Sequence, residues 1–199
     1  MSKSEAYLNG GRKLTNRVND PFEWEYDPLM DSSSDLGPIL MNYYHTQIGV
    51  MRCMVELGRI DIITEVSILS SQLALPREGR LESVFSIFGY LKGYHNTGMV
   101  LYPTYPTPDM SMFQEHGWCC FYGDVKEEIP PNAPEPRGKG VDLRIFVDSD
   151  HAGDKLTRRS RNGYIIFLNN YPIAWLSKKQ ATIETSVFGA EFVSMKIGM

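Results

Sequence analysis

Cysteine is scarce in this chain of 199 residues, and its pattern provides no disulfide framework. The three cysteines are Cys53, Cys119 and Cys120, an odd set that includes an adjacent pair. Such a set excludes the small disulfide-stapled secreted domains and favours a reducing compartment. No histidine stands at zinc-ligand spacing from these cysteines, so we expect free thiols, buried or neutral, and no metal site built on them.

Long apolar runs are absent as well. No segment approaches the roughly 20 apolar residues of a membrane-spanning helix. The N-terminal MSKSEAYLNGGRKLTNR contains no apolar core of signal-peptide length. We therefore expect no contact with a membrane and no secretion.

An overall excess of positive charge is also missing, because 20 basic residues face 24 acidic ones. Residues 1–42 and 103–140 are acidic and residues 43–102 are balanced, whereas residues 141–199 carry eight basic and six acidic side chains. The last stretch is the only basic one. Basic stretches can meet phosphates, although a solvated surface is the commoner reason for a charge cluster.

Apolar and aromatic residues are plentiful, at 42% and 12%, which is enough for a buried core. Apolar residues recur at helical spacing in three successive segments between residues 43 and 93. The three stripes are Ile48, Met51 and Val55; Ile62, Val66, Leu69 and Leu73; and Leu81, Val84, Phe85, Phe88 and Leu91. We predict a small bundle of three helices, the second stopped by Pro76 and the third ending at Gly93 as its C-cap.

The last third of the chain changes to a strand-like period. Residues 141–147 alternate between apolar and polar, and residues 164–168 and 171–176 are two further strand segments with an Asn169-Asn170 turn between them. Pro172 is tolerated at the start of a strand or on an edge. A helix is predicted from about residue 185, with Thr185 or Ser186 as its N-cap. Residues 98–102 are also strand-like.

Proline marks the boundary between these two patterns. Residues 130–138 hold four prolines in nine positions, which is typical of an extended linker and unsuited to a helix or a central strand.

Two carboxylates have unusual positions. Asp148 ends the first strand within Phe-Val-Asp-Ser-Asp-His-Ala-Gly-Asp, where it could project into a cleft or cap a turn. Glu191 lies beside the apolar stripe of the last helix, where it needs a partner, a metal or a path to solvent. An Asp on a first strand and a Glu on the helix after a three-strand meander form an oxygen pair that suits Mg²⁺. Two such ions can clamp the attacking and leaving oxygens of a phosphodiester.

The motifs around these carboxylates resemble the ribonuclease H region of Ty1/copia-type retrotransposon polyproteins. The matching runs are Asp148-Ser-Asp-His-Ala-Gly-Asp154, Thr157-Arg-Arg-Ser160, Gly163-Tyr164, Pro172-Ile-Ala-Trp-Leu-Ser-Lys-Lys-Gln180 and Ala190-Glu-Phe192. Upstream, four further runs resemble the segment that closes the reverse transcriptase of the same family, its thumb and connection helices. They are Tyr44-His-Thr-Gln-Ile-Gly-Val-Met-Arg52, Arg59-Ile-Asp-Ile62, Val66-Ser-Ile-Leu-Ser70 and Tyr90-Leu-Lys-Gly93.

The resemblance implies an α/β (α+β) fold class in four segments. Residues 1–40 are polar and poorly defined, residues 41–102 are the helical thumb/connection-like region, and residues 103–140 are a Pro-rich linker. Residues 141–199 would be a truncated ribonuclease H-like domain, consisting of a three-strand antiparallel meander and the first helix.

The resemblance also implies roles for individual residues. Asp148 and Glu191 would be the catalytic, metal-binding carboxylates, with Mg²⁺ as the cofactor. Segments that approach the nucleic-acid backbone would carry Arg158, Arg159, Lys178 and Lys179. The implied partners are an RNA–DNA hybrid and the remaining parts of the polyprotein. The implied location is intracellular, in the cytoplasm, a virus-like particle or the nucleus.

Several features depart from the family pattern. The polymerase motif Tyr-x-Asp-Asp is absent, Gly189 stands where many members carry an acid, and the chain ends before the third and fourth carboxylates of the family. We therefore expect a fragment of a reverse transcriptase/ribonuclease H polyprotein that has little or no hydrolytic activity alone. Two alternatives stay open: a degenerate remnant that binds nucleic acid without cleaving it, and a translated relic that folds poorly.

Overall fold

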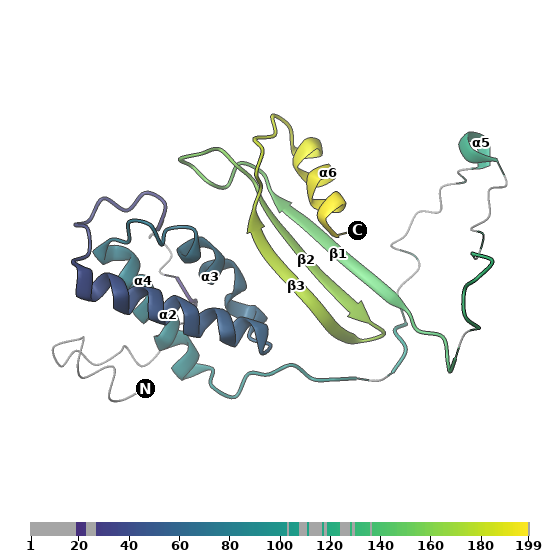
Figure 1. The fold of residues 1–199 in the computed structure, drawn as a ribbon, viewed down its shortest axis with the longest axis horizontal. Coiled ribbons are helices and arrows are strands. Elements are labelled where there is room, and N and C mark those ends of the chain that lie inside the picture. Colours follow the sequence, from purple (N-terminus) through teal and green to yellow (C-terminus); the bar gives the residue numbers. More distant parts are fainter. Residues whose placement is uncertain are drawn as a thin grey trace.

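A computed structural model describes residues 19–22, 27–102, 104–107, 111, 117, 119–123, 128, 130–135 and 137–198. Most of the segment 1–40 and much of the segment 103–140 therefore lie outside or only partly inside the described residues. The described helices and strands fall into two parts, a helical unit (residues 38–93) and a sheet unit (residues 143–198) (Figure 1). A mixed α/β architecture is thus confirmed.

The helical unit consists of α2 (Pro38–Glu56), the 3₁₀ turn η1 (Ile60–Ile62), α3 (Ile63–Ser70) and α4 (Glu78–Gly93). Proline at the first position of α2 is favourable because its missing N–H would lack a helical partner there. The predicted stripes form one apolar core, whose fully buried members include Ile48, Met51, Leu69 and Val84. The three-helix prediction is confirmed.

Three local predictions in this region are wrong. Helix α3 ends at Ser70, and Leu73 packs on the core from the turn that follows. The apolar spacing in the sequence therefore continues beyond the end of the helix. Gly93 closes α4 but is its last helical residue, and the C-cap is Tyr94 at φ −113°. Residues 98–102 form no strand, because the described chain gives them no neighbouring strand to pair with.

The sheet unit is an antiparallel meander of β1 (Leu143–Asp150), β2 (Arg161–Leu168) and β3 (Tyr171–Lys179), followed by α6 (Val187–Gly198). Asn169 adopts a positive φ of 55° in the predicted turn. Pro172 lies on the edge strand β3, next to a register shift between Ile166 and Phe167, as its missing N–H requires. Ser186 is the N-cap of α6, since its Oγ accepts the N–H of Gly189 at 3.0 Å.

The two faces of the sheet have different neighbours. Helix α6 covers β1 and part of β2 through small residues one turn apart, Ala190, Ser194 and Gly198. A Cβ on Gly198 would come within 2.8 Å of Val147 Cγ2, so the absence of a side chain there permits the close approach. Helix α3 lies against β3 instead (Figure 1).

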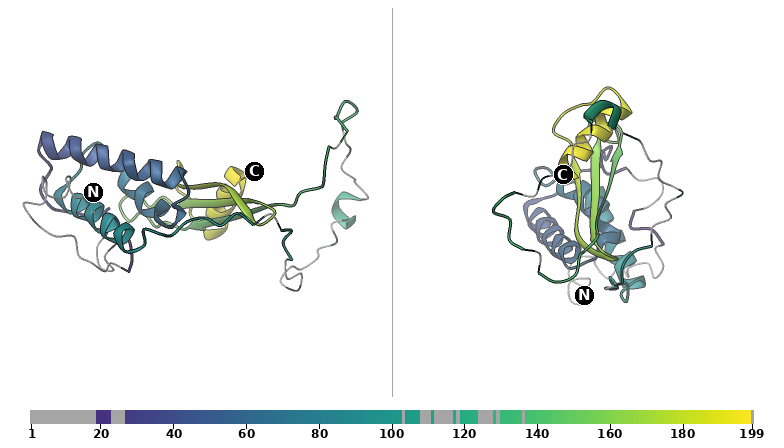
Figure 2. Two further views of the ribbon diagram at one scale, coloured as in Figure 1. Left: turned by 90° about the horizontal axis from the view of Figure 1, so that it is seen from below. Right: turned by 90° about the vertical axis from the view of Figure 1, so that its right-hand side faces the viewer.

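Hydrogen bonds between described residues join the helical unit to the sheet unit. Trp175 Nε1 donates to the Val55 carbonyl at 3.0 Å, and Ser67 Oγ donates to the Ser177 carbonyl at 2.7 Å while it accepts from Arg161 Nη1 at 2.6 Å. Trp175 also packs on the helical core. The views in Figure 2 show the resulting elongated arrangement, with the helical unit at one end of the sheet.

The segment between the units departs from a purely extended linker. One helical turn, α5 (Cys119–Tyr122), lies within it. All three cysteines are free, as predicted, and they are exposed, so of the two expected states, buried or neutral, burial is wrong. In the described part of the chain, no helix has the length and apolarity needed to cross a bilayer.

Candidate nucleic-acid interface

The first predicted carboxylate, Asp148, lies near the end of β1 with Gly163 of β2 as its ladder partner. Side chains alternate along a strand, and the neighbouring Val147 faces α6 near Gly198. Asp148 therefore shares the other side of β1 with Phe146 and Asp150. Its side chain is exposed, and it lines an open cavity of about 590 Å³ that also touches η1 and α3.

The second predicted carboxylate, Glu191, is half-buried on α6, directly after the buried Ala190. Carboxylate oxygens are ligands that Mg²⁺ accepts, so the chemistry of Asp148 and Glu191 suits the ion. However, no group of three or more His, Cys, Asp or Glu side chains converges as a metal site within the described residues. The residues present therefore do not fit a complete magnesium site.

The loop after β1 is held together by Asp154, which is almost fully buried. Its Oδ1 accepts the backbone N–H groups of Leu156 and Thr157 at 3.1 and 2.9 Å, and its Oδ2 accepts from Lys179 Nζ at 2.9 Å. Burial alone would raise the pKa of Asp154, but the bonds from Thr157 and Lys179 leave that pKa below its ordinary value. Asp154 thus caps a turn, the role that Asp residues commonly have at strand ends.

The four predicted nucleic-acid contacts have different surroundings. Arg158 and Lys178 are exposed, and Arg158 has the strained φ of 58°. Arg159 is half-buried, and its Nε has no hydrogen-bond partner in the part of the chain that the structure describes. Lys179 is paired with Asp154. Arg158 and Lys178 are therefore the members of this set with the freest charges.

A buried polar cluster fixes α6 against the same strands. Asn162 Oδ1 accepts from Gln180 Nε2 and from Ser194 Oγ, both at 2.5 Å, and Gln180 Nε2 also donates to the Ala190 carbonyl at 3.0 Å. Buried polar groups are costly unless they are bonded in this way. The cluster ties β2, β3 and α6 together next to the basic residues.

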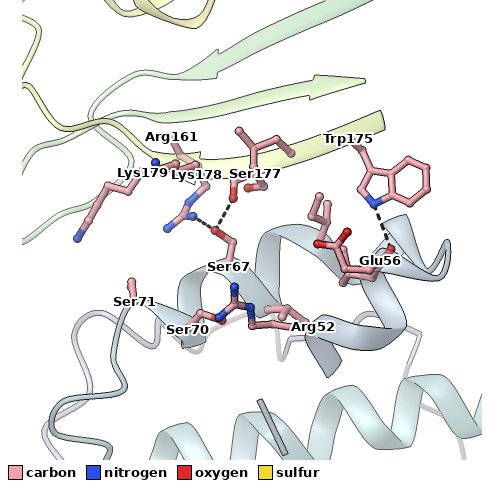
Figure 3. Close-up of a pocket in the computed structure, with 14 residues that line it drawn as sticks. Arg52, Glu56, Ser67, Ser70, Ser71, Arg161, Trp175, Ser177, Lys178 and Lys179 are labelled. Atoms are coloured by element: carbon pink, nitrogen blue, oxygen red, sulfur yellow. Dashed lines mark hydrogen bonds between the residues drawn. The ribbon is translucent and has the colours of Figure 1, made fainter. Parts of the chain in front are cut away.

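Lys178 and Lys179 line a cleft of about 430 Å³ between the two units (Figure 3). The sheet also contributes Arg161 and Trp175 to this cleft. The helical side contributes Arg52 and Glu56 from α2 and Ser67 and Ser70 from α3, with Ser71 just beyond its end. The cleft thus has four cationic side chains and one carboxylate, and each wall contributes cations.

Arg52, Arg161 and the serines were not predicted as site residues. Arg161 belongs to the basic stretch that sequence identifies, and Arg52 closes one of the runs that carry the family resemblance. Their convergence depends on the packing of α3 against β3, across more than 90 positions of sequence. Residues so far apart in the sequence form no local pattern, so the sequence alone does not reveal this site.

Comparison with known proteins shows which proteins this chain is similar to. The chain is 30% identical over 137 residues to the retrovirus-related Pol polyprotein from transposon RE1 of Arabidopsis thaliana, an alignment that covers 69% of this chain and 7% of the polyprotein. It is 27% identical over 151 residues to the Pol polyprotein from transposon TNT 1-94 of Nicotiana tabacum, covering 76% of this chain and 9% of that protein. This chain is related to a segment of the retrovirus-related Pol polyproteins of transposons.

The resemblance seen in the motifs is thereby confirmed at the level of the retrotransposon Pol polyprotein. The chain spans less than a tenth of the length of these two Pol relatives. A shorter match, 40% identical over 50 residues, is to secreted RxLR effector protein 161 of Plasmopara viticola and covers 25% of this chain and 35% of the effector. No family model matches the chain, and no solved structure matches it.

Proposed function

We propose that this chain is the piece of a Pol polyprotein that joins the end of a reverse transcriptase to the beginning of a ribonuclease H domain. The order of its parts supports the assignment, because a helical unit precedes a three-strand meander and a helix. The observation that carries it is the position of Asp148 on the first strand and Glu191 on the following helix, in a chain related to Pol. These are the elements to which the family resemblance assigns the two carboxylates, although Asp148 lies on the side of β1 that faces away from α6.

The activity that we propose for the intact polyprotein is Mg²⁺-dependent hydrolysis of the RNA strand in an RNA–DNA hybrid. For the 199-residue chain alone, we propose binding to the hybrid without hydrolysis. The basic residues Arg158 and Lys178 support binding, because exposed cations can contact phosphates without reading sequence. The lack of three converging metal-ligating side chains among the described residues supports the absence of cleavage.

A cleavage assay tests the inactive state directly. The purified chain is incubated with a labelled RNA–DNA hybrid and Mg²⁺, beside the Asp148→Asn variant as the matched control. We expect both proteins to bind the hybrid, which then migrates more slowly in a gel, and neither protein to produce cleaved RNA. Cleavage by the native chain that disappears in Asp148→Asn would show that the chain is an active nuclease.

The second candidate is a degenerate remnant that binds nucleic acid and has lost the capacity for catalysis. It is favoured by Gly189 in α6, where many members of the resembled family carry an acid. A fusion separates the two candidates: the Pol sequence of transposon RE1 that follows its aligned segment is joined after Met199. A reference protein carries the corresponding RE1 segment throughout.

If the chain is a fragment, the fusion cleaves the hybrid and Asp148→Asn abolishes that cleavage. If the reference protein cleaves while a folded fusion does not, the chain is a remnant. Circular dichroism of both proteins confirms that they are folded before they are compared.

A further inference from the structure

The cleft between α3 and β3 has more positive charge than its own carboxylates can neutralise. Its cations are Arg52, Arg161, Lys178 and Lys179, and its one carboxylate is Glu56. Asp154, which lies outside the cleft lining, already pairs with Lys179. In the part of the chain that the structure describes, Arg52, Arg161 and Lys178 have no ion-pair partner within 4.0 Å.

Arg161 is the most constrained of these cations. It is half-buried, and its Nη1 donates to Ser67 Oγ at 2.6 Å. Burial lowers the pKa of its guanidinium, although Asp154 and Asp150 oppose that shift from a distance. Arg161 also stands directly opposite Lys179 in the β2–β3 ladder, and like charges in opposed positions repel each other. An anion in the cleft would offset both costs.

The opposite wall contributes a third polar group, the hydroxyl of Ser70. Among the described residues, Ser70 Oγ is buried without a hydrogen-bond partner, whereas the hydroxyls of Ser67 and Ser71 are already bonded to backbone carbonyls. A buried hydroxyl without a partner is costly. Figure 3 shows Arg52 extending beside Ser70, below Ser67 and the Arg161 guanidinium.

Two guanidinium groups and a free hydroxyl match a ligand with several acceptor oxygens. Guanidinium binds phosphate oxygens in a forked geometry, and it is the preferred side chain where phosphate is recognised. The exposed Lys178 extends the positive surface beyond the cleft along β3. This continuity suits a phosphate within a polymer better than an isolated small anion.

We propose that this cleft binds a backbone phosphate of the nucleic acid, held by Arg161, Arg52 and the hydroxyl of Ser70. The proposal rests on the proposed function and adds to it a defined phosphate subsite made by both units. The helical unit then contacts the nucleic acid directly, through α2 and α3, and does more than support the sheet.

Fluorescence anisotropy with a labelled RNA–DNA hybrid tests the subsite in the full chain. The variants are Arg161→Gln and Arg52→Gln, and the matched control is Lys92→Gln, which removes an exposed charge from α4 outside the cleft. Each cleft variant should bind roughly tenfold more weakly and lower the slope of log K against log salt by about one, because one phosphate contact is lost. The Lys92→Gln protein should bind like the native chain.

Arg161 in β2 also bonds to Ser67 in α3, so Arg161→Gln could disturb the packing of the two units. Two further variants, Arg161→Lys and Ser70→Ala, are therefore measured beside it. The Lys variant keeps the charge and loses the fork, and it should recover part of the affinity. If Arg161→Gln fails to fold, as judged by circular dichroism, Arg52→Gln and Ser70→Ala decide the outcome. Affinities and salt slopes equal to those of Lys92→Gln in all folded cleft variants would overturn the subsite, while binding by the native chain would leave the proposed function intact.

A second probe separates failure of the subsite from failure of the function. If the native chain does not bind the hybrid, the proposed function fails, and inorganic phosphate then tests the cleft as an anion site. A phosphate-dependent rise in the melting temperature of the native chain, lost in Arg52→Gln, would support the site. No rise would overturn it.

Discussion

The helical unit and the sheet unit bury opposite kinds of side chain. The large apolar residues that are fully buried in the described chain, such as Ile48, Met51 and Ile87, all lie in the helical part. In the sheet unit the buried residues are mainly polar, among them Asp154, Asn162 and Gln180. The first unit is held by apolar packing and the second by hydrogen bonds, which are more specific and individually weaker.

The apolar residues of the sheet unit are almost all exposed or half-buried. They include Ile145 and Phe146 on β1 and Phe188, Phe192 and Met195 on α6. Burial of apolar surface dominates folding stability, so the two units should respond very differently to the loss of an apolar side chain. The difference also bears on function, because buried charged and hydrogen-bonding groups are concentrated in the sheet unit, which has few buried apolar residues.

Truncating matched isoleucines should give the largest contrast. Ile87→Ala in α4 removes a fully buried side chain and should lower the free energy of unfolding by about 3–4 kcal/mol. Ile145→Ala in β1 removes a side chain that is 41% exposed, and it should cost less than about 1 kcal/mol. Urea denaturation measures both values, and equal losses would contradict the contrast between the units.

Removal of the Asp154 carboxylate should give the next largest effect. Asp154→Asn breaks the Lys179 ion pair and weakens the loop after β1, which should cost about 2 kcal/mol at pH 7. Because the folded-state pKa of Asp154 is lowered, its contribution is present above its ordinary value of 3.8 and is lost as pH falls through the folded value.

Stability measured from pH 7 to pH 2 should therefore decline more steeply in the native chain than in Asp154→Asn. The matched control is Asp148→Asn, whose exposed side chain should change stability by less than about 0.5 kcal/mol. If the free energy of unfolding falls equally steeply with decreasing pH in the native chain and in Asp154→Asn, this carboxylate does not couple folding to pH.

The contact between the units is the next feature to test. Trp175→Phe keeps most of the ring packing but removes the bond to the Val55 carbonyl, and it should cost about 1 kcal/mol. The sheet unit should then unfold at a lower temperature than in the native chain. Hydrogen exchange measures this as faster exchange of the β3 amides, while exchange of the α4 amides stays unchanged. Equal loss of protection in α4 would mean that the two units unfold as one.

The smallest effect is expected at the start of α6. Ser186→Ala removes the N-cap bond to the Gly189 N–H and should cost about 0.5–1 kcal/mol, seen as faster amide exchange in the first turn. Ser186→Asp keeps an accepting oxygen at the cap and should behave like the native chain. Equal exchange rates in the Ala and Asp variants would rule out a capping role for Ser186.

Sequence reasoning succeeded where one local pattern governs one element. The stripes through α2 and α4 identify helices because a single apolar face packs on a single core. It failed at the start of β2, where Arg161 and Asn162 precede the predicted apolar run 164–168. Their side chains enter the cleft and the polar cluster, so alternation of hydrophobicity cannot detect them.

The candidate site was predictable only in part for a related reason. Of the residues that line the cleft, Lys178 and Lys179 stand out in the sequence because they are adjacent cations within its basic C-terminal stretch. Arg52 and Ser70 do not, since each is an ordinary polar residue on its own helix. They acquire significance when α3 packs against β3 and places Arg161 across from them.

Hydrogen–deuterium exchange with and without a bound RNA–DNA hybrid tests the central claim most directly. The account predicts that the hybrid protects amides around Arg158 and Arg161 in the sheet unit and around Ser70 in α3, while α4 stays unchanged. Protection should fade as salt rises, because phosphate contacts are electrostatic. Protection confined to α4, or no protection in either unit at low salt, would contradict the account.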